Sequence, residues 1–171
     1  MTTAQKRVCV IGGVVSGLVA IKELLAEGHV PVCFEAAATF GEVFAPEGVE
    51  SRRIYENLRL TIAITYMAFS DFPPLPGDAY RYWTAVEYFN YVQAYAAYFD
   101  LLRHIQFNTR VVSVSKLQNG EGPVNWHVRC DNGIESTFDA VAVFCGTHQA
   151  GRDLTANYPS LMHFKGQVST P

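Results

Sequence analysis

Arg7-Val-Cys-Val-Ile-Gly-Gly-Val-Val-Ser-Gly17 is the stretch that decides the fold of this chain. Its first half is a short apolar run typical of a buried strand, and its second half is a glycine turn that opens a helix. A second apolar run, residues 30–34, ends at Glu35. A strand, a glycine turn, a helix and a second strand followed by an acidic residue predict a dinucleotide-binding βαβ unit.

The residues of this unit indicate how it would hold a nucleotide. Backbone N–H groups at the helix N-terminus favour a pyrophosphate, because the helix dipole is positive there. The carboxylate of Glu35 can accept hydrogen bonds from ribose hydroxyls. The candidate contacts in the turn are Gly12, Gly13, Val14, Ser16 and Gly17.

The turn departs from the G-x-G-x-x-G pattern at its middle position. Gly12 and Gly17 fill the ends, whereas Val14 replaces the middle glycine and Gly13 stands one place early. The middle glycine normally lets the backbone approach the phosphates, so a valine puts a β-branched side chain where the ligand should sit. If the turn requires a positive φ at this position, valine adds a strain of about 1–2 kcal/mol. The residues alone leave two alternatives open, a nucleotide site and a Rossmann-like turn that binds none.

Composition limits the class of protein. The 171 residues are 49% hydrophobic and 17% charged, which predicts one globular domain with a sizeable core. A net charge of −3 without a basic run argues against a nucleic-acid partner. The five histidines are too scattered to predict a metal site, and no segment is long enough to span a bilayer.

The cysteines indicate a reducing compartment. None of the four forms a C-x-x-C pair, and each stands in or beside an apolar strand pattern. This placement favours small buried thiols over disulfides or zinc ligands, and we expect a cytoplasmic protein. The four positions are Cys9, Cys33, Cys130 and Cys145.

Two helices are predicted from caps and periodicity. The first runs from about Ser16 to Glu27, with Gly28 as its C-terminal stop. The second begins after Thr84, because Thr84 and Glu87 fit a capping box. We interpret an aromatic stripe at helical spacing in the second helix as core packing against a sheet. The stripe consists of Tyr88, Phe89, Val92, Tyr95, Ala96 and Phe99.

Strand patterns follow the second helix. Residues 110–117, 124–130 and 135–138, separated by turn-rich stretches, predict an antiparallel meander. The apolar run of residues 140–145, closed by Gly146, predicts a parallel strand buried on both faces. The predicted fold class is therefore α/β, a Rossmann-type parallel sheet with an inserted antiparallel β-meander.

This order of elements and several segments resemble the N-terminal part of the flavin-containing monooxygenases. The segment Phe69-Ser-Asp-Phe-Pro73 is more specific to that family than the glycine turn. The other similar segments are residues 10–18, 31–35, 138–143 and 164–166. The resemblance covers nearly the whole chain and implies a Rossmann-type FAD-binding domain that is incomplete.

The resemblance also implies FAD contacts outside the turn. Glu35 would hold the adenosine ribose, and the backbone of Val111 would meet the adenine. Thr61 would lie beside the flavin, where many family members carry an asparagine. The loop that includes Gly41, Val43 and Phe44 would line the flavin, and Gly146 would approach the cofactor.

In function, the resemblance implies an enzyme that uses FAD, NADPH and O2. Its small-molecule substrate would be oxygenated at nitrogen or sulfur, or would be a ketone in a Baeyer–Villiger reaction. Residues 1–171 would be the N-terminal segment of the FAD-binding domain, without the NADPH-binding domain that the full-length enzyme carries. No residue is predicted to act as a catalytic acid, base or nucleophile, and the isolated chain is predicted not to turn over NADPH.

Two alternatives stay open beside the monooxygenase fragment. One is a non-catalytic FAD-binding module, and the other is a degenerate remnant that pairs with another chain. An incomplete domain would leave an open sheet edge and exposed apolar surface. We therefore predict self-association or a second chain that completes the domain.

Overall fold

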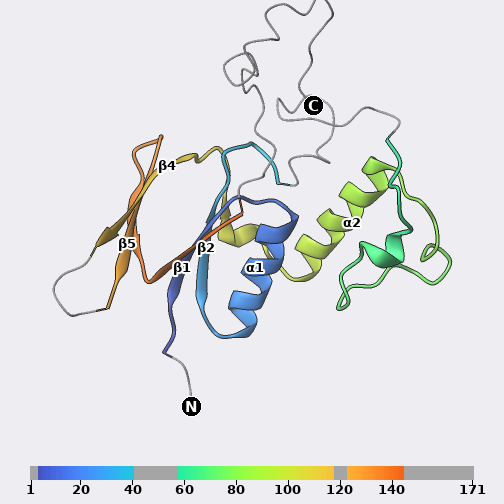
Figure 1. Ribbon diagram of the computed structural model, residues 1–171, viewed down its shortest axis with the longest axis horizontal. Coiled ribbons are helices and arrows are strands. Elements are labelled where there is room, and N and C mark those ends of the chain that lie inside the picture. Colours follow the sequence, from blue (N-terminus) through green and yellow to red (C-terminus); the bar gives the residue numbers. More distant parts are fainter. Residues whose placement is uncertain (1–3, 41–57, 118–122, 145–171) are drawn as a thin grey trace, which may run out of the picture.

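The computed structural model describes residues 4–40, 58–117 and 123–144, which form two sheets and two α-helices (Figure 1). A parallel sheet has the order β3-β2-β1-β7, with β1 at Arg7–Ile11, β2 at Val30–Phe34, β3 at Ile105–Gln106 and β7 at Ala140–Val143. An antiparallel sheet has the order β4-β5-β6, with β4 at Val111–Leu117, β5 at Asn125–Cys130 and β6 at Glu135–Phe138. The helices are α1 (Val15–Ala26) and α2 (Ala85–Tyr98), with short 3-10 turns η2 (Ile64–Tyr66) and η3 (Leu102–His104).

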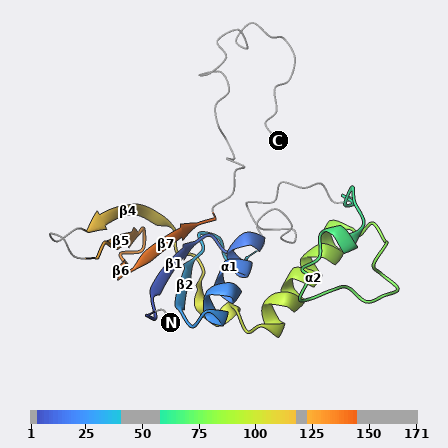
Figure 2. The ribbon, with the colours of Figure 1, turned by 60° about the horizontal axis from the view of Figure 1, so that its bottom comes forward.

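The described residues form layers, with the parallel sheet between the helices and the antiparallel sheet (Figures 1 and 2). Successive side chains of a strand point to opposite faces, and both central strands show this alternation. Val10 and Cys33 pack on the helix side, whereas Cys9 and Phe34 pack against Phe138 of the antiparallel sheet. The two central strands, β1 and β2, are therefore covered on both faces.

The aromatic stripe of α2 belongs to the helix-side core. Tyr88, Phe89, Val92, Tyr95 and Ala96 are buried there together with Leu18 and Ile21 of α1. Phe99 packs against the same cluster and is partly buried. The prediction that this stripe is core packing is confirmed.

The first helix and the meander agree with the sequence patterns. Helix α1 begins at Val15, one residue earlier than predicted, and Gly28 follows it with a φ of 78°. Strands β4, β5 and β6 form the predicted antiparallel meander, and β7 pairs in parallel with β1. The α/β fold class with its inserted meander is confirmed.

Two features of the parallel sheet differ from the sequence prediction. The two-residue strand β3 was not predicted, because two residues are too few to show a periodicity. Residues 140–145 were predicted to form a strand buried on both faces, and for the strand residues 140–143 this is wrong. Strand β7 is half-buried and its Val143 is 59% exposed, because β7 is an edge strand within the described part of the sheet.

Candidate dinucleotide site

The glycine turn joins β1 to α1 in a conformation that only glycine tolerates at two positions. Gly12 has a φ of 103°, which side chains rarely adopt, and its N–H donates to the Phe34 carbonyl at 2.9 Å. A Cβ atom on Gly17 would lie 2.0 Å from the Gly12 carbonyl oxygen. The first glycine therefore makes the turn, and the last lets α1 pack closely against it.

Val14 occupies the N-cap of α1 in an extended conformation, with φ −73° and ψ 174°. A φ in this range carries no left-handed strain, so the strain considered for valine from the sequence is absent. Its side chain is half-buried and caps no amide, since valine has no acceptor. The first-turn amides of Val15, Ser16 and Gly17 therefore lack a side-chain cap from the N-cap residue.

Glu35 follows β2 and reaches the glycine turn with its carboxylate. The side chain is buried, with only 8% of the residue exposed. One carboxylate oxygen accepts a hydrogen bond from the Gly13 N–H at 2.5 Å, and the other accepts from the Ala37 N–H at 2.8 Å. Two backbone donors therefore fix the carboxylate beside the turn, and each oxygen keeps further lone-pair capacity for a ligand hydroxyl.

Backbone hydrogen bonds bring the start of β4 to the same end of the sheet. The Asn108 N–H donates to the Ala37 carbonyl at 3.0 Å, and the Thr109 N–H donates to the Glu35 carbonyl at 2.8 Å. Val111 begins β4 two residues later and packs against the core between the sheets. The glycine turn, Glu35 and the approach to Val111 are thus assembled around the C-terminal ends of β1 and β2.

Thr61 lies on a different segment, which runs antiparallel to the approach to α2. The Leu60 N–H donates to the Trp83 carbonyl at 2.8 Å, and the Ile64 N–H donates to the Arg81 carbonyl at 3.0 Å. Thr61 itself is exposed. The position of Thr61 is therefore set by the packing of residues 58–64 on the segment before α2.

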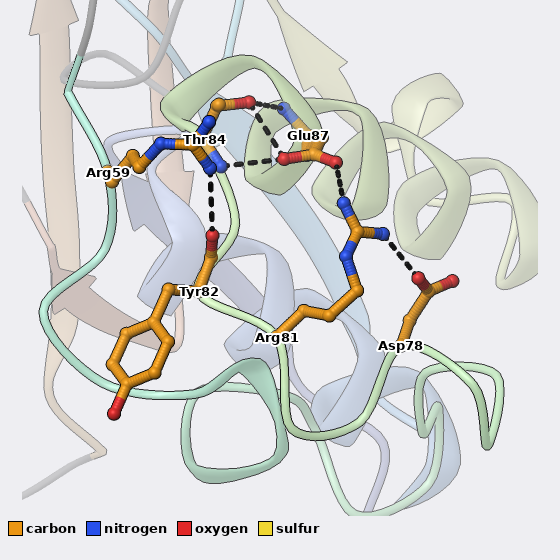
Figure 3. A network of polar contacts seen from close by, with 6 residues as sticks. All are labelled: Arg59, Asp78, Arg81, Tyr82, Thr84 and Glu87. Carbon is orange, nitrogen blue, oxygen red and sulfur yellow. Dashed lines mark hydrogen bonds and ion pairs between the residues drawn. The ribbon is translucent and has the colours of Figure 1, made fainter.

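A polar network joins residues 78–84, which precede α2, to the N-terminus of that helix (Figure 3). The Thr84 hydroxyl accepts from the Glu87 N–H at 3.2 Å, while the Glu87 carboxylate accepts from the Thr84 N–H at 2.7 Å. Arg81 bridges Glu87 at 2.8 Å and also pairs with Asp78. The backbone hydrogen bond from Thr84 is the main cause that lowers the pKa of Glu87, with the guanidinium of Arg81 adding to it. The predicted capping box is confirmed.

The family-like segment at residues 69–73 is docked between the two helices. Its Asp71 forms an ion pair with Lys22 of α1. The Tyr91 hydroxyl of α2 donates to the Phe72 carbonyl at 2.6 Å and accepts from the Phe69 N–H at 2.8 Å. The hydrogen bond to Asp71 is the largest cause that raises the pKa of Lys22, so the amine stays charged. This segment is therefore a structural clamp between α1 and α2.

Several site residues lie beyond what the structure describes or were missed by sequence reasoning. The predicted contacts Gly41, Val43, Phe44 and Gly146 lie outside the described residues. The amide of Ala37 was missed, because a backbone donor has no sequence signature. The ion pair between Lys22 and Asp71 was missed, because the two residues are distant in sequence and meet only in the fold.

The buried thiols behave as the sequence indicates. Burial raises the pKa of Cys9 and of Cys33 to about 12, so both thiols are neutral at physiological pH. Cys130 is also a free, buried cysteine, and Cys145 lies outside the described residues. Within the described ranges no cluster of histidine, cysteine or acidic residues could hold a metal ion.

The residues at the glycine turn fit a dinucleotide. The turn has no side chain at Gly12 and Gly13, the first turn of α1 lacks a side-chain cap, and a buried carboxylate stands beside it. A diphosphate is attracted by such amides, and a ribose by such a carboxylate. The fold and this end of the sheet therefore define a Rossmann-type domain of the kind that binds dinucleotides.

Comparison with known proteins identifies the family. The family model described as "Flavin-binding monooxygenase-like" matches residues 5–170, and the chain belongs to this family. It is 39% identical over 168 residues to a 4-hydroxybenzoate brominase (decarboxylating) of Marinomonas mediterranea. It is 36% identical over 172 residues to flavin-containing monooxygenase 5 of Mus musculus. Each alignment covers 96% of this chain, but only 30% of the first relative and 32% of the second.

Solved structures agree with this assignment. The S-allyl-L-cysteine S-oxygenase from Allium sativum superposes with a TM-score of 0.72 at 25% identity, over 84% of this chain and 37% of that one. An oxidized steroid monooxygenase bound to NADP superposes with a TM-score of 0.66 at 30% identity, over 84% of this chain and 26% of the other. The resemblance to the flavin-containing monooxygenases is thus confirmed. In the part of the chain that is described, no helix is long and apolar enough to cross a membrane.

Proposed function

We propose that residues 1–171 form the N-terminal, FAD-binding part of a flavin-dependent monooxygenase. The observation that carries this proposal is the first turn of α1, which has no side-chain cap and lies beside the buried carboxylate of Glu35. The family assignment supports FAD as the dinucleotide. NADPH is the proposed second cofactor of the full-length enzyme, in line with a solved relative that is described as bound to NADP.

Each described residue has a proposed part in holding FAD. The first-turn amides of α1, including those of Ser16 and Gly17, would donate to the diphosphate, where the dipole of α1 adds to the attraction. Glu35 would accept from the ribose hydroxyls while the Gly13 and Ala37 amides keep its carboxylate in place. The backbone of Val111 would face the adenine. The half-buried side chain of Val14 would bound the diphosphate on one side.

Further contacts are proposed for the flavin end of the cofactor. Thr61 would offer one hydroxyl donor beside the ring. Gly41, Val43, Phe44 and Gly146 are proposed from the family resemblance. The chemistry that FAD supplies when bound is acceptance of a hydride from NADPH and activation of O2. The substrate class that we propose is a small molecule with a soft nitrogen or sulfur, or a ketone.

We further propose that these 171 residues alone do not turn over NADPH. The chain spans about 30% of the length of the curated relatives that it matches, and its glycine turn is assigned to FAD. Pure chain loaded with FAD should therefore show no substrate-dependent NADPH consumption. Steady NADPH oxidation accompanied by oxygenated product would contradict this part of the proposal.

A purification tests the FAD assignment. The purified chain, supplied with FAD and freed of excess, should show the visible absorbance bands of bound flavin. Glu35→Gln should weaken FAD binding, because the carboxamide NH2 is a hydrogen-bond donor, whereas both carboxylate oxygens of Glu35 are acceptors. The exposed Glu27→Gln is the matched control and should bind FAD as the parent chain does. A chain that takes up no flavin would overturn the assignment.

The second candidate function is a flavin-binding module that is completed by another chain. The observation that favours it is the edge strand β7, whose Val143 is 59% exposed. An exposed apolar edge favours pairing with a further strand. Sedimentation should then show self-association of the pure chain, whereas a monomer that melts cooperatively would contradict this candidate.

A further inference from the structure

The N-termini of α1 and α2 share one backbone conformation at the N-cap but differ in the side chain there. Val14 has φ −73° and ψ 174°, and Thr84 has φ −71° and ψ 163°. Valine and threonine have the same branched shape, in which a methyl group of valine replaces the hydroxyl of threonine. The cap of α2 therefore shows how far the side chain of Val14 can reach along α1.

At α2 this reach extends to the amide of the third helical residue. The Thr84 hydroxyl accepts a hydrogen bond from the Glu87 N–H at 3.2 Å (Figure 3). The residue at the corresponding place in α1 is Gly17. Valine offers the Gly17 amide no acceptor, while its two methyl groups fill the volume that a threonine hydroxyl and methyl would fill. Val14 therefore takes up space at the mouth of α1 without pairing an amide.

The first turn of α1 is accessible from outside. The N–H groups of Val15, Ser16 and Gly17 have no hydrogen-bond partner among the residues that the structure describes. Ser16 is exposed and Val14 is half-buried, so the described residues leave this end of the helix open to solvent. Of the three turn residues 12–14, Val14 is the one that carries a side chain. Access to these amides from the turn therefore depends on the size of that side chain.

We propose that the side chain of Val14 limits how closely the diphosphate of FAD approaches the first-turn amides of α1, and that it thereby sets the affinity of this site. The inference rests on the proposed FAD site and names the residue that determines how strongly that site binds. Diphosphate oxygens accept charge-assisted hydrogen bonds from backbone amides, and these bonds weaken as the distance grows. A branched side chain at the N-cap keeps the anion further from the amides than alanine or glycine would.

A series of side chains at position 14 tests this proposal. Val14→Ala removes both methyl groups of the isopropyl branch, and Val14→Gly removes the whole side chain. Neither variant adds a side-chain cap to α1. Titration calorimetry should show FAD bound about threefold more tightly by Val14→Ala and about tenfold more tightly by Val14→Gly than by the parent chain. Val86→Ala, at an exposed valine in the first turn of α2, is the matched control and should bind FAD as the parent chain does.

Ligands that are parts of FAD locate the effect. ADP contains a diphosphate and should show the same gain in affinity, whereas adenosine lacks it and should bind the parent chain and the Val14 variants equally. In an ¹H–¹⁵N spectrum, the amide signals of Ser16 and Gly17 should shift further on addition of ADP in Val14→Gly than in the parent chain. These shifts report the hydrogen bonds to the diphosphate, so a change in fold stability alone would not produce them.

The outcomes separate this inference from the proposed function. FAD affinity that is unchanged or weaker in both Val14→Ala and Val14→Gly would overturn the role of Val14 while the FAD site stands. A gain in Val14→Gly alone would assign the effect to the backbone freedom of glycine, and an equal gain for adenosine would place it away from the diphosphate. Either result would also overturn the inference. Failure of FAD and ADP to bind the parent chain and every variant would overturn the proposed function, and the role of Val14 with it.

Discussion

The N-termini of α1 and α2 show two opposite ways to treat the free amides of a helix. At α2, Thr84 and Glu87 satisfy each other's backbone donors, and Arg81 closes the network from outside. At α1, Val14 stands at the N-cap and caps nothing. One helix end is closed by its own residues, whereas the other leaves its first-turn donors to a group that α1 does not supply.

Each of the two helix N-termini has a glutamate nearby, and the place of that glutamate in the chain explains the difference. Glu87 belongs to α2 and accepts at the N-cap itself. Glu35 comes from the end of β2 and accepts from Gly13, the residue before the N-cap of α1. The carboxylate thus stands beside the amides of α1 without covering them. The pairing of an uncapped helix with a neighbouring acid is what a dinucleotide requires, since the diphosphate and the ribose need opposite partners.

The largest effect on stability should come from the close contact between Gly17 of α1 and the Gly12 carbonyl. In Gly17→Ala, the new Cβ would lie 2.0 Å from the Gly12 carbonyl, so α1 must move away from the turn. Chemical denaturation should show the free energy of unfolding reduced by about 3 kcal/mol. Gly77→Ala, where a Cβ meets nothing within 4 Å, is the matched control. Equal stability of both variants would contradict the close packing of α1.

The next effect should come from the glutamate that faces α1. Glu35→Gln places an amide donor opposite the N–H of Gly13 or Ala37, which leaves a buried donor unpaired. The free energy of unfolding should fall by about 2 kcal/mol. The exposed Glu27→Gln should change it by less than about 0.5 kcal/mol. If the two variants melt alike, the carboxylate of Glu35 is not held as described.

Removal of the cap at α2 should have a smaller effect. Thr84→Ala deletes the hydroxyl that accepts from the Glu87 N–H and should lower the free energy of unfolding by about 1 kcal/mol. Thr65→Ala, at an exposed threonine of η2, is the control for loss of a hydroxyl alone. A cost at Thr84 no larger than at Thr65 would show that the capping box adds nothing to stability.

The smallest effect should be the pH dependence of the same cap. Hydrogen bonds from Thr84 lower the pKa of Glu87 in the folded chain. Its contribution to stability is then complete above the ordinary glutamate pKa of about 4.3 and is lost as the pH falls through the lower folded value. The stability difference between the parent and Glu87→Gln should therefore shrink below about pH 4.3. A difference that grows on acidification would contradict the direction of this shift.

Local sequence patterns predicted the structural elements that are determined by residues close together in the sequence. The glycine turn, α1, the capping box at Thr84 and the meander each rest on a few adjacent residues, and all were predicted. The strand β3 was not, because its two residues gain their pairing from β2. The exposure of β7 was not predicted either, since an apolar run does not reveal how many neighbours its strand has.

The residues of the candidate site also fall into those that a local sequence pattern predicts and those that only the fold reveals. Glycines and an acidic residue after a strand are visible in sequence, so the turn and Glu35 were found. The negative φ of Val14 was not predicted, because the sequence does not show which residue of the turn takes the positive φ. In the structure that residue is Gly12.

The central claim is that the N-terminus of α1 is left uncapped for a diphosphate, and the affinity for FAD at Val14 variants tests it most directly. Val14→Ser supplies the missing cap, and Val14→Asp supplies the cap with a negative charge. Both should stabilise α1 by about 0.5–1 kcal/mol. Titration calorimetry should show FAD bound by the parent chain and at least about tenfold more weakly by Val14→Asp than by Val14→Ser. FAD binding by Val14→Asp that is as tight as in the parent chain would contradict the account.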